Sequence, residues 1–86
     1  MSFNINYDGQ PEKFLRKLDK HIALRIADKI EDALSANLVP HNATTIVGEH
    51  GVYRIRIGDF RVLYIVHYDT KEITVFNIDK RSRVYD

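Results

Sequence analysis

The chain has 86 residues, the size of one small domain, and we expect a single domain over residues 1–86. Its 44% hydrophobic and 29% charged residues are typical of a globular protein and exclude a disordered chain. A net charge of +1 excludes a uniformly basic surface, and the absence of cysteine excludes a disulfide framework or a thiolate metal site.

The N-terminal half predicts one strand followed by two helices. Residues 3–7 alternate between apolar and polar types, which is the period of a half-buried strand, and residues 8–10 indicate a turn. Apolar residues then recur at helical spacing, and Asp19 interrupts them with a good N-cap. We therefore predict a short helix over 11–18 and a longer one over about 20–36. Two helices joined so closely form a hairpin that must pack on another layer.

The C-terminal half changes to a period of two. Residues 37–51 indicate a connection with a short extended piece at 44–47. After it we predict three strands joined by tight turns: 52–57, 60–68 and 72–79, with turns at 58–59 and 69–71. The order is β-α-α-β-β-β. It predicts an α+β fold in which the helical hairpin packs on a small, mostly antiparallel twisted sheet.

Positive charge is concentrated in this C-terminal half. Residues 1–50 contain six Lys/Arg and seven Asp/Glu, whereas residues 51–86 contain seven and five. The two-residue turn fixes the hairpin register, so that Arg56 lies opposite Arg61, and Arg54 lies one pleat away on the same face as Leu63 and Ile65. Like charges placed opposite one another destabilise a sheet by about 0.2–1 kcal/mol. This arrangement suggests a defined anion site.

Two interpretations of the three arginines remain open. Their side chains either extend into solvent or pair with Glu49, Asp59 or Glu72, or they form a cradle that grips a phosphate through planar guanidinium groups. Three arginines on one face favour the cradle.

The C-terminal tail supports a nucleic-acid ligand. Lys80, Arg81 and Arg83 follow the last predicted strand, and we expect them to bind substrate beside the arginine face, together with Tyr85. Cationic groups suit a phosphate backbone, and an aromatic ring suits an unstacked base. A basic segment at a chain end is more commonly just solvated charge.

The four histidines do not have the spacing of a metal site, and we expect no metal and no other cofactor. His50 and His67 are candidates for a proton carrier near the arginines, although a structural role is the commoner one for each. The four glycines all mark turns, so they do not form a phosphate-binding loop.

The stretch from Tyr53 to Tyr85 resembles the RelE branch of the RelE/ParE toxin superfamily. It contains a strand with alternating basic residues, a tight turn, an arginine that opens an apolar strand (FRVLY, 60–64) and a closing basic segment (KRSRVY, 80–85). The N-terminal half has the family's order of a short strand and two helices, with the segment FLRKLDK. The resemblance thus covers nearly the whole chain.

This resemblance implies the toxin of a toxin–antitoxin system, a ribosome-dependent endoribonuclease that cleaves mRNA in the A site. The ribose 2′-hydroxyl attacks the adjacent phosphate and leaves a 2′,3′-cyclic phosphate and a 5′-hydroxyl. By position, Arg61 matches the arginine that binds the scissile phosphate. Arg81 matches the arginine that stabilises transition-state charge and protonates the leaving group, and Tyr85 matches the tyrosine that stacks on or orients the substrate.

The chain departs from the family at three positions. Arg54 and Arg56 stand where the best-studied members have lysines, and Lys80 stands where many relatives have histidine. A guanidinium stays protonated in proteins, so Arg54 and Arg56 are better suited to stabilise the phosphorane charge than to take a proton. The general base would then be a histidine, a carboxylate such as Glu49, or solvent.

The expected partners are a cognate RelB-like antitoxin, in a hetero-oligomer, and the ribosome with its mRNA. The N-terminus lacks the segments of a signal peptide, and the apolar runs are shorter than the roughly 18 residues of a membrane span, so we expect a cytoplasmic protein without membrane contact. Two alternatives remain: a ParE-like toxin that inhibits DNA gyrase without cutting RNA, and a degenerate toxin that only joins its antitoxin on operator DNA.

Overall fold

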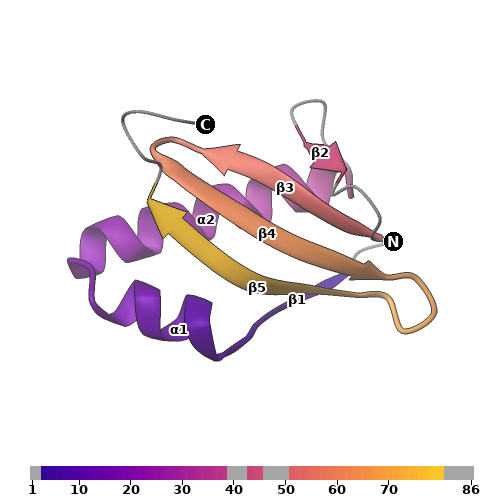
Figure 1. Ribbon diagram of the computed structural model, residues 1–86, viewed down its shortest axis with the longest axis horizontal. Coiled ribbons are helices and arrows are strands. Elements are labelled where there is room, and N and C mark those ends of the chain that lie inside the picture. The colour runs from indigo at the N-terminus through magenta and orange to yellow at the C-terminus, as the bar shows by residue number, and fades with distance from the viewer. Residues whose placement is uncertain (1–2, 39–42, 46–50, 81–86) are drawn as a thin grey trace.

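Five strands form one mixed sheet in the order β1-β5-β4-β3-β2, and two helices accompany it (Figure 1). The computed structural model describes residues 3–38, 43–45 and 51–80. Along the chain the elements are β1 (Asn4–Tyr7), α1 (Gly9–Arg16), α2 (Lys20–Ala36), β2 (Thr44–Thr45), β3 (Val52–Ile57), β4 (Phe60–His67) and β5 (Glu72–Lys80). The predicted α+β class and order of elements are confirmed, because β2–β3, β3–β4 and β4–β5 are antiparallel and β1–β5 is the parallel pair.

The two helices begin at different kinds of N-terminus. The Asp19 carboxylate caps α2 by accepting a hydrogen bond from the backbone N–H of His21 at 2.9 Å, as the sequence predicted. α1 begins at Gly9, earlier than predicted, because the N–H of Glu12 already donates to the Asp8 carbonyl at 3.1 Å. The segment 8–10 is therefore the first turn of a helix and its cap rather than a separate turn.

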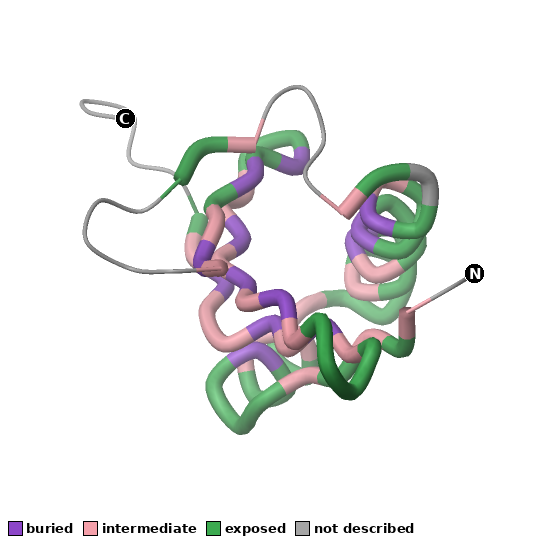
Figure 2. Tube along the Cα trace, turned by 90° about the vertical axis from the view of Figure 1, so that its right-hand side faces the viewer, coloured by how far each residue is buried: buried purple, intermediate pink, exposed green. Residues whose placement is uncertain are grey.

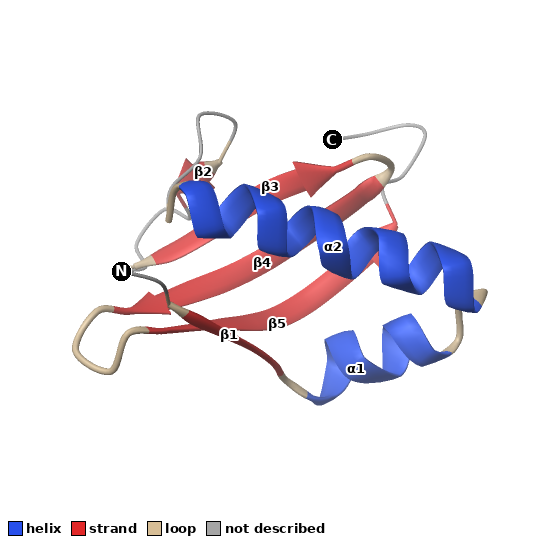
Figure 3. Ribbon diagram, turned by 180° about the vertical axis from the view of Figure 1, so that it is seen from behind, coloured by secondary structure: helices blue, strands red, loops and turns tan. Residues whose placement is uncertain are grey.

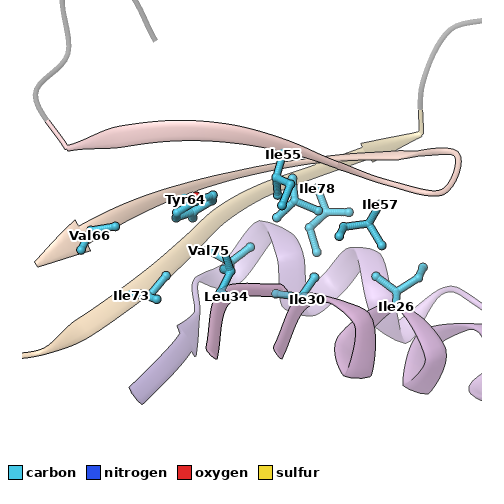
Figure 4. Packing of buried hydrophobic residues seen from close by; sticks show 11 residues of the cluster. Ile26, Ile30, Leu34, Ile55, Ile57, Tyr64, Val66, Ile73, Val75 and Ile78 are labelled. Atoms are coloured by element: carbon cyan, nitrogen blue, oxygen red, sulfur yellow. The ribbon is translucent and has the colours of Figure 1, made fainter. Parts of the chain in front are cut away.

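The core lies between α2 and one face of the sheet. α2 runs across that face (Figure 3), and its side chains Ile26, Ile30 and Leu34 point at the apolar residues of β3, β4 and β5 (Figure 4). Figure 2 shows these buried positions of the helix and of the sheet turned toward one another, with exposed positions outside. Burying each such side chain contributes about 1.5–3 kcal/mol, so this layer supplies most of the driving force for folding.

The β3–β4 hairpin has the register that the two-residue turn predicts. Gly58 adopts a φ of +58°, which a glycine accepts without strain, and the turn places Ile57 opposite Phe60. Strand alternation then buries Ile55 and Val62 against α2 and directs the residues between them to the opposite face. That face, which is turned toward the viewer in Figure 1, carries neither helix of the described chain.

A β-bulge in β5 reverses the alternation of that strand. Leu63 pairs with Asn77 whereas Tyr64 pairs with Val75, so Phe76 is an extra residue. Before the bulge Val75 is buried, and after it Ile78 is buried, three residues further on rather than two or four. Asp79, which follows Ile78, consequently lies on the outer face of the sheet, opposite α2.

Gln10 of α1 completes the edge of β5 where β1 has ended. Its side-chain amide donates to the Ile78 carbonyl at 3.0 Å, and its amide oxygen accepts from the Ile78 N–H at 2.9 Å. This pair of bonds replaces the missing strand neighbour, because both backbone groups of Ile78 would otherwise need another partner. The end of β5 is thus held between β4 and α1.

Candidate functional site on the outer sheet face

Three charged residues form a row across the outer face of the sheet. Arg56 of β3 pairs in register with Arg61 of β4, and Arg61 pairs in register with Asp79 of β5. Residues directly opposite on antiparallel strands share a face, with Cβ atoms about 4.5–5.5 Å apart. The structure therefore brings together the two arginines that the sequence predicted to oppose each other, and it adds a carboxylate beside them.

Arg54 extends the row along β3. It lies opposite Leu63 on one side and opposite Thr44 of β2 on the other, and its side chain is exposed. Arg56 is likewise exposed, whereas Arg61 is half-buried in the middle of the sheet. The predicted trio of arginines is present, with Arg56 next to both Arg54 and Arg61.

A row of this kind has a plain electrostatic consequence. Two guanidinium groups on adjacent strands repel each other, and a carboxylate on the third strand offsets part of that repulsion. Planar guanidinium groups form bidentate hydrogen bonds with phosphate and carboxylate groups, so an anion of either kind bound at this pair would offset repulsion further.

The described part of the tail ends at this site. Lys80 is the last residue of β5 and follows Asp79 along the strand, but it pairs in register with Phe60 and so lies on the helix side of the sheet, where it is exposed. The other predicted tail residues, Arg81, Arg83 and Tyr85, lie outside the described residues.

The structure removes His67 from the list of proton carriers for the arginine row. His67 ends β4, six residues beyond Arg61, which corresponds to about 20 Å along a strand. Its Nε2 lies 3.2 Å from Thr74 Oγ1, and its register partner is Glu72. Glu72 is therefore also too far away to pair with the arginines. The remaining candidates Glu49 and His50, like His41, lie outside the described residues.

Among the described residues, no group of three or more His, Cys, Asp or Glu side chains is placed to hold a metal ion. Within the same residues, neither helix combines the length and the apolar character that crossing a membrane requires.

A separate hollow lies in the helical layer, between α1 and α2. It has a volume of about 490 Å³ and is lined mainly by the apolar residues Leu15, Leu18, Ala23 and Leu24, with Tyr7 of β1. The Tyr7 hydroxyl is buried and finds no hydrogen-bond partner within the described chain. Burial, and then the nearby carboxylates of α2, raise the pKa of Tyr7 to about 12.

Asp79 and Gln10 are the residues that the sequence analysis missed. A strict period of two through β5 places Asp79 on the same side as Ile73 and Val75, which is the core side. The signal that identifies it is the spacing of the buried residues, because Ile78 follows Val75 by three positions and so indicates a bulge. The hydrogen bonds between Gln10 and Ile78 join residues 68 positions apart, so the local sequence pattern does not predict them.

Comparison with known proteins identifies the family of this chain. The family model described as the ParE toxin of the type II toxin–antitoxin system parDE matches residues 5–85. A curated relative from Methanocaldococcus jannaschii, named RelE1, is 33% identical over 88 residues, which cover 99% of this chain and 97% of the relative.

Solved structures agree with this match. The archaeal RelE–RelB complex from Pyrococcus horikoshii contains a chain with a TM-score of 0.75 at 28% identity, covering 96% of this chain and 99% of that one. The RelBE2 toxin–antitoxin complex of Mycobacterium tuberculosis contains a chain with a TM-score of 0.79 at 18% identity, covering 94% and 100%, which shows a common fold. This chain therefore belongs to the ParE toxin family of type II toxin–antitoxin systems and is a RelE-like toxin of the RelE/ParE superfamily.

Proposed function

We propose that this toxin is a ribosome-dependent endoribonuclease that cleaves mRNA in the A site. The observation that carries the proposal is the opposed pair Arg56 and Arg61 on the open face of the sheet, with Arg54 beside them. A fold of this size has only about 5–15 kcal/mol of net stability, and a like-charged pair in register reduces it. A role in binding the phosphate of a substrate explains why the fold contains this destabilising pair.

The proposed reaction is attack of a ribose 2′-hydroxyl on the adjacent phosphate. The O2′–P bond forms as the P–O5′ bond breaks, and the products are a 2′,3′-cyclic phosphate and a 5′-hydroxyl. Charge builds up on the phosphorane oxygens in the transition state, and fixed cationic donors stabilise that charge more than the charge of the ground state.

The residues divide into three roles in this proposal. Arg61, at the centre of the row, holds the scissile phosphate, and Arg54 and Arg56 stabilise the phosphorane. Arg81 stabilises the same charge and donates a hydrogen bond to the leaving oxygen, while Tyr85 stacks on or orients the substrate. Lys80 and Arg83 hold the flanking RNA backbone. The roles of Arg81, Arg83 and Tyr85 rest on their match to the family pattern in the sequence.

The sharpest test is primer extension on translating ribosomes with purified toxin. We expect discrete cuts at A-site codons with the wild type, and a loss of at least about 100-fold with Arg61→Ala or Arg81→Ala, the loss usual for removal of a charge-stabilising donor. Arg25→Ala is the matched control, because Arg25 is exposed on α2, away from the outer face. If cuts are absent with the wild type, or persist unchanged in Arg61→Ala, the enzyme proposal is wrong.

We further propose that a RelB-like antitoxin binds this chain in a hetero-oligomer. RelE relatives occur in complexes with RelB in the solved structures from Pyrococcus horikoshii and Methanococcus jannaschii. On this chain, half-buried Leu63 and Ile65 lie beside the arginines, a combination that suits an acidic amphipathic segment. We expect co-expression with such an antitoxin to raise the yield and to suppress cleavage. A good yield of active toxin alone would count against it.

A second candidate function follows from the family model, which is described for ParE toxins. A ParE-like toxin would inhibit DNA gyrase without cutting RNA. A supercoiling assay distinguishes the two candidates: inhibition of gyrase by purified protein, with intact mRNA on ribosomes, would favour the ParE-like activity.

A further inference from the structure

We propose that the Asp79 carboxylate is the general base that takes the proton from the attacking 2′-hydroxyl. The proposal rests on the endoribonuclease function proposed above. It concerns the step for which the arginines are unsuited, since a guanidinium cannot accept a proton in proteins.

The position of Asp79 is the first argument. It lies opposite Arg61, as the third residue of the row that begins with Arg56. Adjacent strands are about 4.7–4.9 Å apart, so a phosphate held by the two arginines has Asp79 one strand away. A reacting 2′-oxygen lies about 3–3.5 Å from its phosphorus, and a base must come within about 2.6–3.2 Å of that oxygen. A neighbouring strand is the right distance for such a base.

The bulge at Phe76 is the second argument. Without that extra residue, the alternation of β5 would turn Asp79 toward the core and put Ile78 in the charged row. Bulges occur often beside active sites, where they re-aim a side chain. The sheet therefore departs from regular pairing at the point that brings the carboxylate to the arginines.

The anchorage of β5 is the third argument. Gln10 binds both backbone groups of Ile78, the residue that precedes Asp79, and β4 pairs with Asp79 itself. A catalytic group must be held within about 0.5 Å of its productive position. The backbone at Asp79 is fixed from both sides by these contacts.

The charged groups on the elements that flank Asp79 are mostly cationic. Among the described residues, Arg61 and Arg56 share its face of the sheet, whereas Lys80 of β5 and Lys13 and Lys17 of α1, which line a hollow with Gln10, belong to the helix side. In the described part of these elements, the carboxylates are Asp59, exposed in the β3–β4 turn, Glu72 at the far end of β5 and Glu12, exposed on α1. The two arginines also offset the repulsion between the Asp79 carboxylate and the RNA phosphate.

The step balances in protons and bonds. The 2′-hydroxyl proton passes to an Asp79 carboxylate oxygen as the O2′–P bond forms. The P–O5′ bond breaks, and the departing O5′ takes a proton from a cationic donor or from water. Asp79 then returns its proton to solvent, so the net reaction is an intramolecular transesterification that cleaves the RNA chain without consuming water.

The test is the single-turnover cleavage rate as a function of pH, measured on mRNA in ribosomes. With wild type, we expect the rate to rise with pH from the acid side and then level off. Asp79→Asn should lower the plateau by about 10²–10⁴-fold and abolish the acid limb, while Asp79→Glu should keep the limb and recover part of the rate. Thermal unfolding of each variant and its binding to RNA with a 2′-deoxy cleavage site report on the fold and on affinity.

A substrate with sulfur in place of O5′ distinguishes a base from an acid. Thiolate leaves without protonation, so this substrate should rescue a variant that lacks the general acid but not one that lacks the base. The proposal would be overturned if the sulfur substrate restored cleavage by Asp79→Asn. It would also be overturned if Asp79→Asn kept the acid limb of the wild type and only bound RNA more weakly. If Asp79→Asn does not fold, an acid limb in Asp79→Glu identical in position and height to that of wild type would overturn it. A wild type that does not cut refutes the function itself.

Discussion

The two faces of the sheet place side chains of opposite character on the same three strands. On the face covered by α2, Ile55, Val62 and Ile78 lie in register and are almost fully buried. One residue along each strand, on the other face, Arg56, Arg61 and Asp79 lie in register and are wholly or partly exposed. Burial of the apolar row stabilises the folded state, whereas repulsion within the charged row destabilises it. The residues that stabilise the fold and the residues of the candidate site thus lie on opposite faces of the same sheet. Substitutions on the two faces should therefore affect stability and cleavage separately.

The largest effect on stability is expected in the helical layer that closes the apolar face. Ile30 of α2 is fully buried, so Ile30→Ala should lower the free energy of unfolding by about 2–5 kcal/mol. Leu24→Ala, on the same helix but 58% exposed, should change it by less than about 0.5 kcal/mol. Urea titration measures both. Equal losses would show that the face covered by α2 does not carry the stability of this domain.

A smaller loss of stability is expected at Gln10. Its side chain holds the backbone of β5 between the core residue Ile78 and the outer-face residue Asp79. Gln10→Ala removes two hydrogen bonds to Ile78 and should cost about 1–3 kcal/mol, because both backbone groups are partly buried. Lys13→Ala on the same helix serves as the exposed control. The cleavage rate of folded Gln10→Ala should also fall, since the backbone beside Asp79 loses its outer support. A variant as stable as wild type would mean that Gln10 does not hold β5.

An effect of about 1 kcal/mol or less is expected at Tyr7, and it should appear in alkaline solution. The pKa of Tyr7 is raised from 10.0 to about 12, so the folded state holds the proton more tightly than the unfolded state. The stability that this contributes is fully present below pH 10 and is lost as the pH rises through about 12. Tyr7→Phe should therefore weaken the alkaline loss of stability.

At pH 7 the same substitution should cost little, because the Tyr7 hydroxyl has no partner in the described chain. Thermal unfolding of wild type and Tyr7→Phe at pH 7 and between pH 10 and 12 measures both effects. Tyr64→Phe is the contrasting variant: burial also raises the pKa of Tyr64, but its hydroxyl donates to the Leu38 carbonyl at 2.8 Å, so this variant should lose stability at pH 7. Equal losses of stability in Tyr7→Phe and Tyr64→Phe at pH 7 would contradict the view that only the Tyr64 hydroxyl is hydrogen-bonded.

The two faces also differ in how well the sequence predicted them. The β3–β4 register followed from a two-residue turn, and it placed Ile55, Arg56 and Arg61 on the correct faces. Alternation failed beyond the bulge of β5, so Asp79 was not recognised as a neighbour of Arg61. A turn acts over a few residues and can be identified in the local pattern. A bulge, the parallel pairing of β1 with β5 and the Gln10 contact depend on segments far apart in the chain, which one sequence does not relate.

The smallest effect tests the row of charges directly. Because Arg56 and Arg61 lie opposite each other, a double-mutant cycle with Arg56→Gln and Arg61→Gln should give a repulsive coupling of about 0.2–1 kcal/mol in the unfolding free energy. Salt screens exposed charges, so the coupling should shrink between low and high ionic strength. A cycle between Arg56 and Arg25 of α2 is the control and should show no coupling, since the two side chains belong to different layers. A favourable coupling between Arg56 and Arg61 would mean that a neighbouring anion holds the pair together, and the row would then be a structural network rather than a phosphate-binding site.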